Sequence, residues 1–128
     1  MDKAQILRAF NDHFMELVDD IIRVFPDNND IKTLKTAFSR MRKINPKLIL
    51  TAVQAYVLAN YRQEIEAGNL DFFIEKDYSY DLSSIKNSKY IISKIEQLRN
   101  SVRKMNDDDK KNVVKYLHNL LKLSDLYN

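Results

Sequence analysis

His13, Glu16 and Asp20 are the residues whose types and spacing come closest to a metal site. They stand at positions i, i+3 and i+7, so all three side chains can project from one side of a helix. Imidazole and carboxylate groups are ligands for zinc. Helical metal sites, however, gather ligands from several helices, and no second cluster accompanies this one. We interpret the three residues as a polar edge beside a buried stripe, and we predict no metal and no other cofactor.

The remaining polar residues form no pattern that predicts catalysis. Glu64 and Glu66 are neighbours only in sequence, because helical positions two residues apart point in different directions. His118 lies in an apolar stretch, where histidines are commonly packed, and we assign it no role. The chain has one glycine, Gly68, whereas nucleotide-binding loops need several. We therefore predict a protein that is not an enzyme and has no catalytic residues.

A basic segment is the strongest candidate for a binding surface. Lys and Arg number 3 against 7 Asp and Glu in residues 1–30, 7 against 0 in 31–62, 1 against 6 in 63–81 and 10 against 5 in 82–128. A cationic stretch without carboxylates suits contacts with phosphate groups, but it equally suits a solvated face or ion pairs with the acidic first segment. The candidate basic binding face consists of Lys32, Lys35, Arg40, Arg42, Lys43 and Lys47.

Residues 69–82 alternate aromatic and acidic side chains without a sustained period. We expect a short helical turn and an ordered connection there. Tyr78 and Tyr80 are candidate docking aromatics, because aromatic rings are enriched at protein interfaces. For Phe72 and Phe73 we favour a place in the core over a role in docking.

Five stretches are predicted to be helical, and in four of them apolar residues recur at steps of three and four, which predicts helices that each bury one face. The first runs from a capping box at Asp2 to Phe25, and the second starts at an Asp30 cap. The fourth begins near Ser83 and carries a heptad-like apolar seam. The fifth follows Asn106, and its first turn is rich in carboxylates.

The third stretch is apolar on almost every side for three turns. Pro46 suits the first helical position, and Gly68 suits the position that follows a helix. A helix of this kind belongs at the centre of a bundle. The sequence therefore predicts an all-α fold, a compact bundle of about five helices around a central apolar helix at about 46–67, in a single helical domain of residues 1–128.

Length and composition limit the class of protein. A chain of 128 residues can bury a core without disulfide bonds, and this one has no cysteine. The pattern after Met1 is not that of a secretory signal, and no apolar run reaches the length of about 20 residues that a membrane span needs. We expect an intracellular protein that is not secreted and has no membrane span.

Three stretches carry a resemblance to a known group of proteins, namely residues 10–14 running on to 21–27, residues 45–48 and residues 72–78. Over about residues 7–82 the chain resembles small uncharacterised proteins of nucleocytoplasmic large DNA viruses of algae and protists. The group has no catalytic motif to transfer. The resemblance implies a structural role in a large virion, where minor proteins bridge capsomers, and a location in the virion or the host cytoplasm.

We therefore expect a non-enzymatic interaction or assembly protein, most concretely a viral minor capsid protein that binds other proteins, capsid proteins among them. One alternative is a nucleic-acid-associated viral factor that uses the basic face of residues 32–47. Its mark is DNA binding that weakens steeply as salt rises. Another alternative is a helical adaptor that captures peptides of host proteins. Its mark is an apolar groove on the surface.

Overall fold

The computed structural model describes residues 2–58, 61–69 and 88–128, and all regular structure within these ranges is helical. This confirms the predicted all-α fold. The elements are α1 (Lys3–Val24), α2 (Asn29–Ile44), α3 (Leu48–Val53), the π-helical turn η1 (Gln54–Leu58), α4 (Arg62–Ala67), α6 (Ser88–Arg103) and α7 (Asp107–Tyr127).

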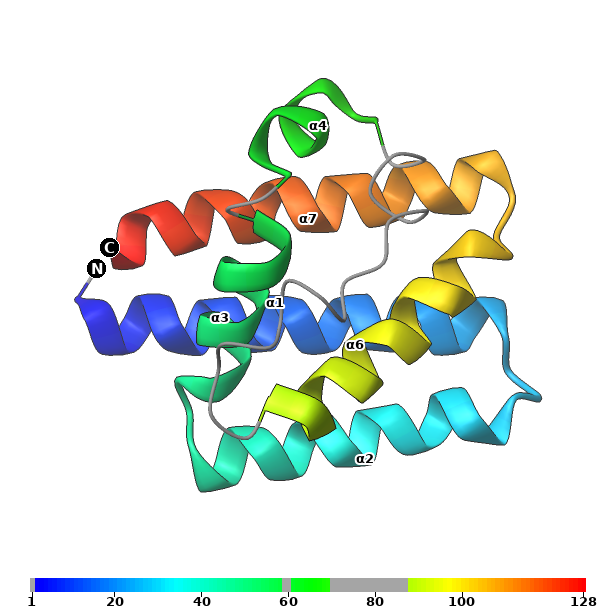
Figure 1. Ribbon diagram of the computed structural model, residues 1–128, viewed down its shortest axis with the longest axis horizontal. Helices are drawn as coiled ribbons and strands as arrows, with labels where there is room; N and C mark the ends of the chain where they lie inside the picture. Colours follow the sequence, from blue (N-terminus) through cyan, green and yellow to red (C-terminus); the bar gives the residue numbers. More distant parts are fainter. Residues whose placement is uncertain (1, 59–60, 70–87) are drawn as a thin grey trace.

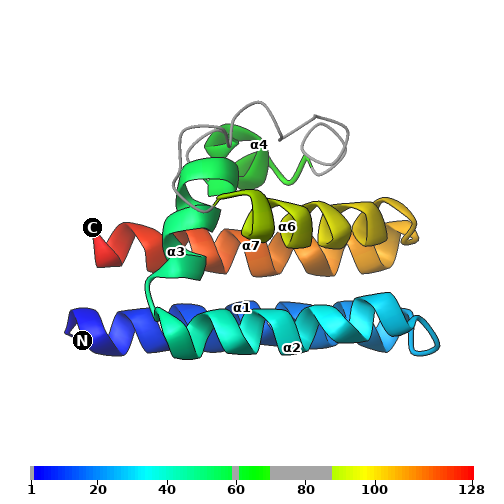
Figure 2. The same ribbon diagram turned by 60° about the horizontal axis from the view of Figure 1, so that its bottom comes forward.

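Helix α1 contacts α2, α3, α6 and α7 and so joins the other elements. Figure 1 shows α7 and α2 on opposite sides of α1, with α6 crossing obliquely from α2 towards α7. In Figure 2, α1 and α2 lie side by side as one layer, and α6 and α7 belong to a second layer. Helix α3 runs from the first layer to the second. The two chain ends are close together, and the Lys3 ammonium lies 5.5 Å from the centroid of the Tyr127 ring.

The α1–α2 hairpin begins and turns largely as its sequence predicts. Asp2 and Gln5 form the capping box, in which the Asp2 carboxylate accepts the Gln5 N–H at 2.8 Å and the Asp2 N–H donates to the Gln5 side chain at 2.9 Å. Helix α1 ends at Val24, with Phe25 as its C-cap before the proline. These hydrogen bonds fix the start of the helix that forms one wall of the candidate site.

The start of α2 differs from the prediction by two residues. The N-cap is Asn28, whose Oδ1 accepts the Ile31 N–H at 3.2 Å. Asp30 is not the cap but lies in the first turn, where its carboxylate favours the positive end of the helix. Both residue types are good N-caps, and the earlier one allows the helix to satisfy more of its own backbone groups.

The segment predicted as one helix at 46–67 is buried as expected but is not continuous. After α2, the Asn45 side chain accepts the Lys47 N–H at 3.1 Å, and this turn delays the start of α3 to Leu48. The π-helical turn η1 and the separate helix α4 follow. Gly68 closes α4 with φ 77°, as its position predicted. Residues of this segment with no more than 3% exposure are Ile49, Leu50, Ala52, Val53, Leu58 and Tyr61.

One hydrophobic cluster receives residues from every described helix. At its centre the Phe14 and Phe38 rings meet edge to face, with centroids 4.9 Å apart. The heptad-like seam is buried as predicted, at Ile91, Ile95, Leu98 and Val102 of α6 and at Met105 just after the helix ends. Helices α1 and α2 turn their main apolar faces into this cluster, and their opposite faces are exposed.

Candidate functional site

Two cations of the predicted basic face are bound by the acidic first helix. Lys35 Nζ lies 2.8 Å from Asp19 Oδ1, and Arg42 Nη2 lies 2.7 Å from Asp12 Oδ1. Both carboxylates belong to α1, so the ion pairs connect the two helices of the hairpin at two separate positions along their length. Pairing with the acidic segment, one of the interpretations left open by the sequence, therefore applies to Lys35 and Arg42.

The other four cations of the face are exposed and make no ion pair within the described part of the chain, namely Lys32, Arg40, Lys43 and Lys47. They differ from Lys35 and Arg42 in direction, because those two side chains reach towards α1. The six residues therefore divide into two that hold the hairpin together and four whose charges remain for ligands.

An open groove of about 730 Å³ lies between α1, the C-terminal half of α2 and the turn that follows α2. Leu7 and Met15 are half-buried there, and both also pack against the hydrophobic core. Arg8 stands on the α1 wall, while Arg42 and Lys43 stand on the α2 wall. Ala4 and Pro46 complete the apolar part of the lining, which contains no carboxylate among the described residues.

Asn11 lies in the groove lining and is only 2% exposed. Its Nδ2 donates to the Pro46 carbonyl at 2.9 Å, and this contact fixes the orientation of the amide because a carbonyl oxygen can only accept. Its Oδ1 is consequently buried with no donor from the described residues. Asn11 is thus a buried amide beneath the groove, held by its hydrogen bond to Pro46.

Sequence reasoning missed this groove, although α1 contains a signal for it. Ala4, Leu7, Asn11 and Met15 follow one another at steps of three and four, as a second stripe beside the main core stripe. Arg8 lies in a segment where acidic residues outnumber basic ones, so counting charges by segment does not single it out. A helical projection of α1 and α2 together would have placed these residues along one seam.

The residues considered as metal ligands lie at the seam between α1 and α7. His13 Nδ1 is 3.2 Å from Glu16 Oε2, and its ring packs on Tyr116 with centroids 4.9 Å apart. Burial, and then the nearby Asp20 and Glu16 carboxylates, raise the pKa of the Tyr116 hydroxyl. Within the described ranges, no three His, Cys, Asp or Glu side chains are grouped so as to hold a metal ion.

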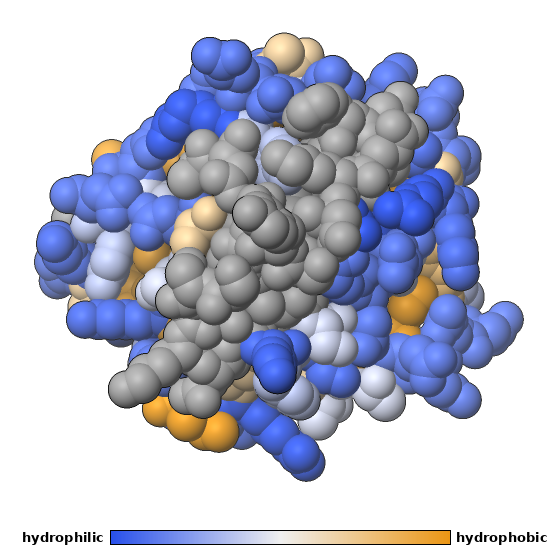
Figure 3. Space-filling model, viewed as in Figure 1, coloured by the Kyte–Doolittle hydropathy of each residue, from blue (hydrophilic) through white to orange (hydrophobic). Residues whose placement is uncertain are grey.

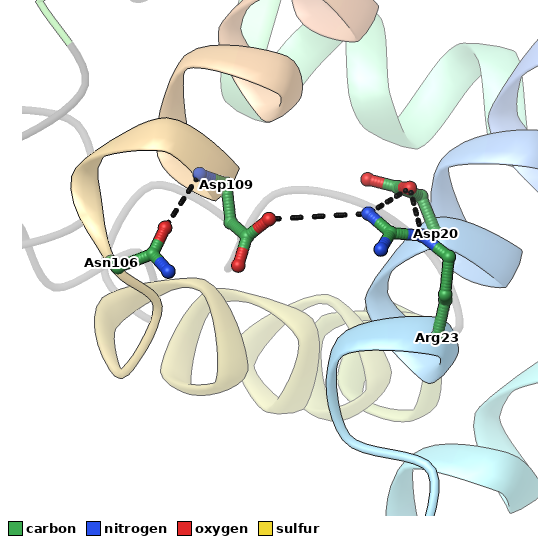
Figure 4. A network of polar contacts seen from close by, with 4 residues as sticks. All are labelled: Asp20, Arg23, Asn106 and Asp109. Carbon is green, nitrogen blue, oxygen red and sulfur yellow. Dashed lines mark hydrogen bonds and ion pairs between the residues drawn. The ribbon is translucent and has the colours of Figure 1, made fainter.

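Asp20 turns instead towards Arg23, at the end of α1 (Figure 4). Arg23 Nε and Nη2 donate to Asp20 Oδ1 at 3.1 and 2.9 Å, and Nη2 also lies 3.9 Å from Asp109 Oδ1. Asn106 caps α7 by accepting the Asp109 N–H at 2.8 Å. The hydrogen bond and the charge of Asp20 raise the pKa of Arg23. These contacts tie the end of α1 to the start of α7.

Arg62, the last cation of the basic segment, is also engaged. Its Nη1 and Nη2 donate to the two carboxylate oxygens of Asp125 at 2.9 and 2.6 Å, which joins α4 to α7. These hydrogen bonds lower the pKa of Asp125. Beside them, Gln54 donates to the Ser124 hydroxyl at 2.8 Å. This surface is therefore built from contacts within the protein.

The candidate docking aromatics Tyr78 and Tyr80 lie outside the described residues, as do Phe72 and Phe73. On the face shown in Figure 3, the described surface is mainly hydrophilic, with hydrophobic residues in separate small groups. Among the described residues, the exposed large hydrophobic side chains are Ile44, Tyr90 and Leu126, from three different helices. The α1–α2 groove is therefore the better candidate site.

Comparison with protein-family models, with curated protein sequences and with solved structures finds no match to this chain. Among the helices that the structure describes, none combines the length and the apolar character needed to cross a bilayer.

Proposed function

We propose that the protein is a non-enzymatic helical interaction protein that binds other proteins through the surface of α1 and α2. The groove between these helices carries the proposal, because apolar side chains there lie between cations and open to solvent. Most other large apolar residues of the described helices pack against the common core. Apolar surface rimmed by polar groups is typical of protein interaction sites.

Cross-linking in the cells that produce the protein tests this proposal. An amine-reactive reagent has two targets near the groove, Lys43 and Lys47, and matched targets far from it on α7, Lys111 and Lys115. We expect one partner protein to be joined mainly to Lys43 and Lys47, in a complex that survives nuclease treatment. A complex that disappears with nuclease, or cross-links confined to α7, would contradict the proposal.

The concrete form of this function is a minor capsid protein of a large DNA virus. Its support is the resemblance of residues 7–82 to proteins of such viruses, together with the alternation of acidic and basic segments along the chain, which suits contacts with several neighbours. We expect mass spectrometry of purified virions to find the chain in many copies. Its detection only in extracts of infected cells would defeat the capsid form.

A second candidate function is a nucleic-acid-associated factor, and the four cations without ion pairs favour it. Fluorescence anisotropy with duplex and single-stranded DNA tests this candidate. Affinity should fall steeply as salt rises, and it should fall in Lys32→Glu/Arg40→Glu but not in the matched variant Lys111→Glu/Lys122→Glu. Absence of binding near physiological salt would remove the candidate.

A further inference from the structure

The groove between α1 and α2 combines two features that together restrict its occupant. Its floor is apolar, and its rim is cationic with no carboxylate among the described lining residues. Its volume of about 730 Å³ lies within the range of about 300 to 1,000 Å³ that is usual for ligand pockets. It can therefore hold a few side chains of a peptide.

The charge of the groove determines which charge a partner should carry. Arg42 is partly neutralised by its ion pair with Asp12. Arg8 and Lys43 are exposed on opposite walls and have no ion pair within the described residues. A ligand that lies between these walls meets positive charge on both sides, so carboxylates that flank its apolar part would be complementary.

The apolar floor distinguishes a peptide from a nucleic acid. A peptide can place large apolar side chains on Leu7 and Met15 while its carboxylates meet the cations of the rim. The bases of a nucleic acid find no aromatic ring on which to stack in the described lining. The apolar floor therefore favours a peptide over DNA or RNA.

We propose that this groove binds a short acidic segment of another protein, with one or two large apolar side chains placed between carboxylates. The inference rests on the proposed function and identifies the chemistry of its partner. The apolar side chains contact Leu7 and Met15, and the carboxylates pair with Arg8 and Lys43.

A random twelve-residue peptide library displayed on phage, panned against the full chain, tests this inference. We expect the enriched peptides to contain more Asp and Glu than the starting library, together with at least one large apolar residue. One such peptide, synthesised with a fluorophore, should bind the Arg8→Glu/Lys43→Glu variant at least about tenfold more weakly than the unaltered protein. The same peptide with each carboxylate replaced by an amide should lose affinity to a similar degree.

The matched control is Lys104→Glu/Lys111→Glu, which changes the net charge equally on exposed residues outside the groove lining. Its affinity should stay within about twofold of the unaltered protein, because only local charge matters at moderate salt. Circular dichroism confirms that each variant is folded. If charge reversal disturbs the helices, Arg8→Gln/Lys43→Gln removes the same cations with less repulsion.

Amide chemical shifts measured during titration with the peptide should change most at Arg8, Asn11 and Ser39. Failure to enrich any peptide, equal affinity of Arg8→Glu/Lys43→Glu, or shifts confined to other surfaces would overturn the inference. A duplex DNA that displaces the peptide and binds more tightly would overturn the choice of a protein partner. If cross-linking finds a protein partner while the peptides map elsewhere, the groove inference fails and the proposed function stands.

Discussion

Asn11 shows why residue types alone did not locate the candidate site. Its sequence context is an apolar stripe, and nothing in that stripe reveals that its amide reaches the Pro46 carbonyl across the hairpin. The contact spans 35 positions in the chain, so it depends on how α1 and α2 pack. The sequence did identify the cations of α2, but the ion pairs that occupy two of them are likewise long-range contacts.

Replacement of Asn11 by alanine should lower the free energy of unfolding by about 1 to 2 kcal/mol. The reason is the loss of the hydrogen bond to Pro46 at a position that is 2% exposed. Urea unfolding measures the change. Ser39→Ala serves as a control in the same groove, and it should change the free energy by less than about 0.5 kcal/mol. Equal effects of the two substitutions would contradict the role given to Asn11.

Asp125 should contribute stability that depends on pH. Hydrogen bonds from Arg62 lower its pKa in the folded protein, so the stabilisation is present above the pKa of the unfolded chain and is lost as pH falls through the lowered value. Asp125→Asn should therefore lower the melting temperature near pH 7, and the difference from the unaltered protein should close towards about pH 2.

Thermal melts monitored by circular dichroism at several pH values measure this gap. The exposed Asp27, which has no ion pair among the described residues, provides the control. The difference in melting temperature between Asp27→Asn and the unaltered protein should not change with pH. A gap for Asp125→Asn that persists undiminished in acid would rule out the carboxylate contact as its cause.

At the scale of elements, local signals predicted most of the helices. The capping box at Asp2 and the glycine after α4 act within a few residues, and the structure confirms both. The backbone of the third stretch was harder to predict. Its apolar residues indicate burial, but they do not indicate whether the α-helix continues without interruption. The π-helical turn at Gln54–Leu58 has no single residue type that marks it in the sequence.

Gly68→Ala should lower the free energy of unfolding by about 1 to 2 kcal/mol, through backbone strain. Gly68 has φ 77°, and nothing lies within 4 Å of a Cβ added there, so a steric clash adds no further cost. Urea unfolding of Gly68→Ala and Gly68→Asn measures the effect. Asparagine tolerates the left-handed conformation better, so its cost should be smaller. A larger cost for asparagine would show that strain is not the cause.

At the scale of the whole molecule, the shared core determines how the helices depend on one another. Phe10 of α1, Leu34 of α2, Ile65 of α4, Leu98 of α6 and Leu120 of α7 belong to one hydrophobic cluster. No described helix can leave this cluster without exposing apolar surface of the others. The sequence predicted this arrangement because four of the expected helices have one apolar face and the third is apolar on almost every side, and only other helices can cover these surfaces.

The chain should accordingly unfold in one cooperative transition. Helical circular dichroism and intrinsic tyrosine fluorescence should give the same midpoint in urea, because loss of the core removes the support for every helix. Leu34→Ala, at a position with no exposure, should move both midpoints together to lower urea. Two separate midpoints would show that part of the chain folds independently of the rest.

The closeness of Lys3 and Tyr127 has a mechanical consequence. Helix α1 starts and helix α7 ends at this end of the molecule, and the two helices are in contact again at Arg23 and Asp109, so they run antiparallel. A force that pulls the two termini apart acts across this seam and separates its contacts one after another. The two helices would separate progressively, starting from the termini. The force needed would be lower than in a fold where the pull acts parallel to the helix–helix interface.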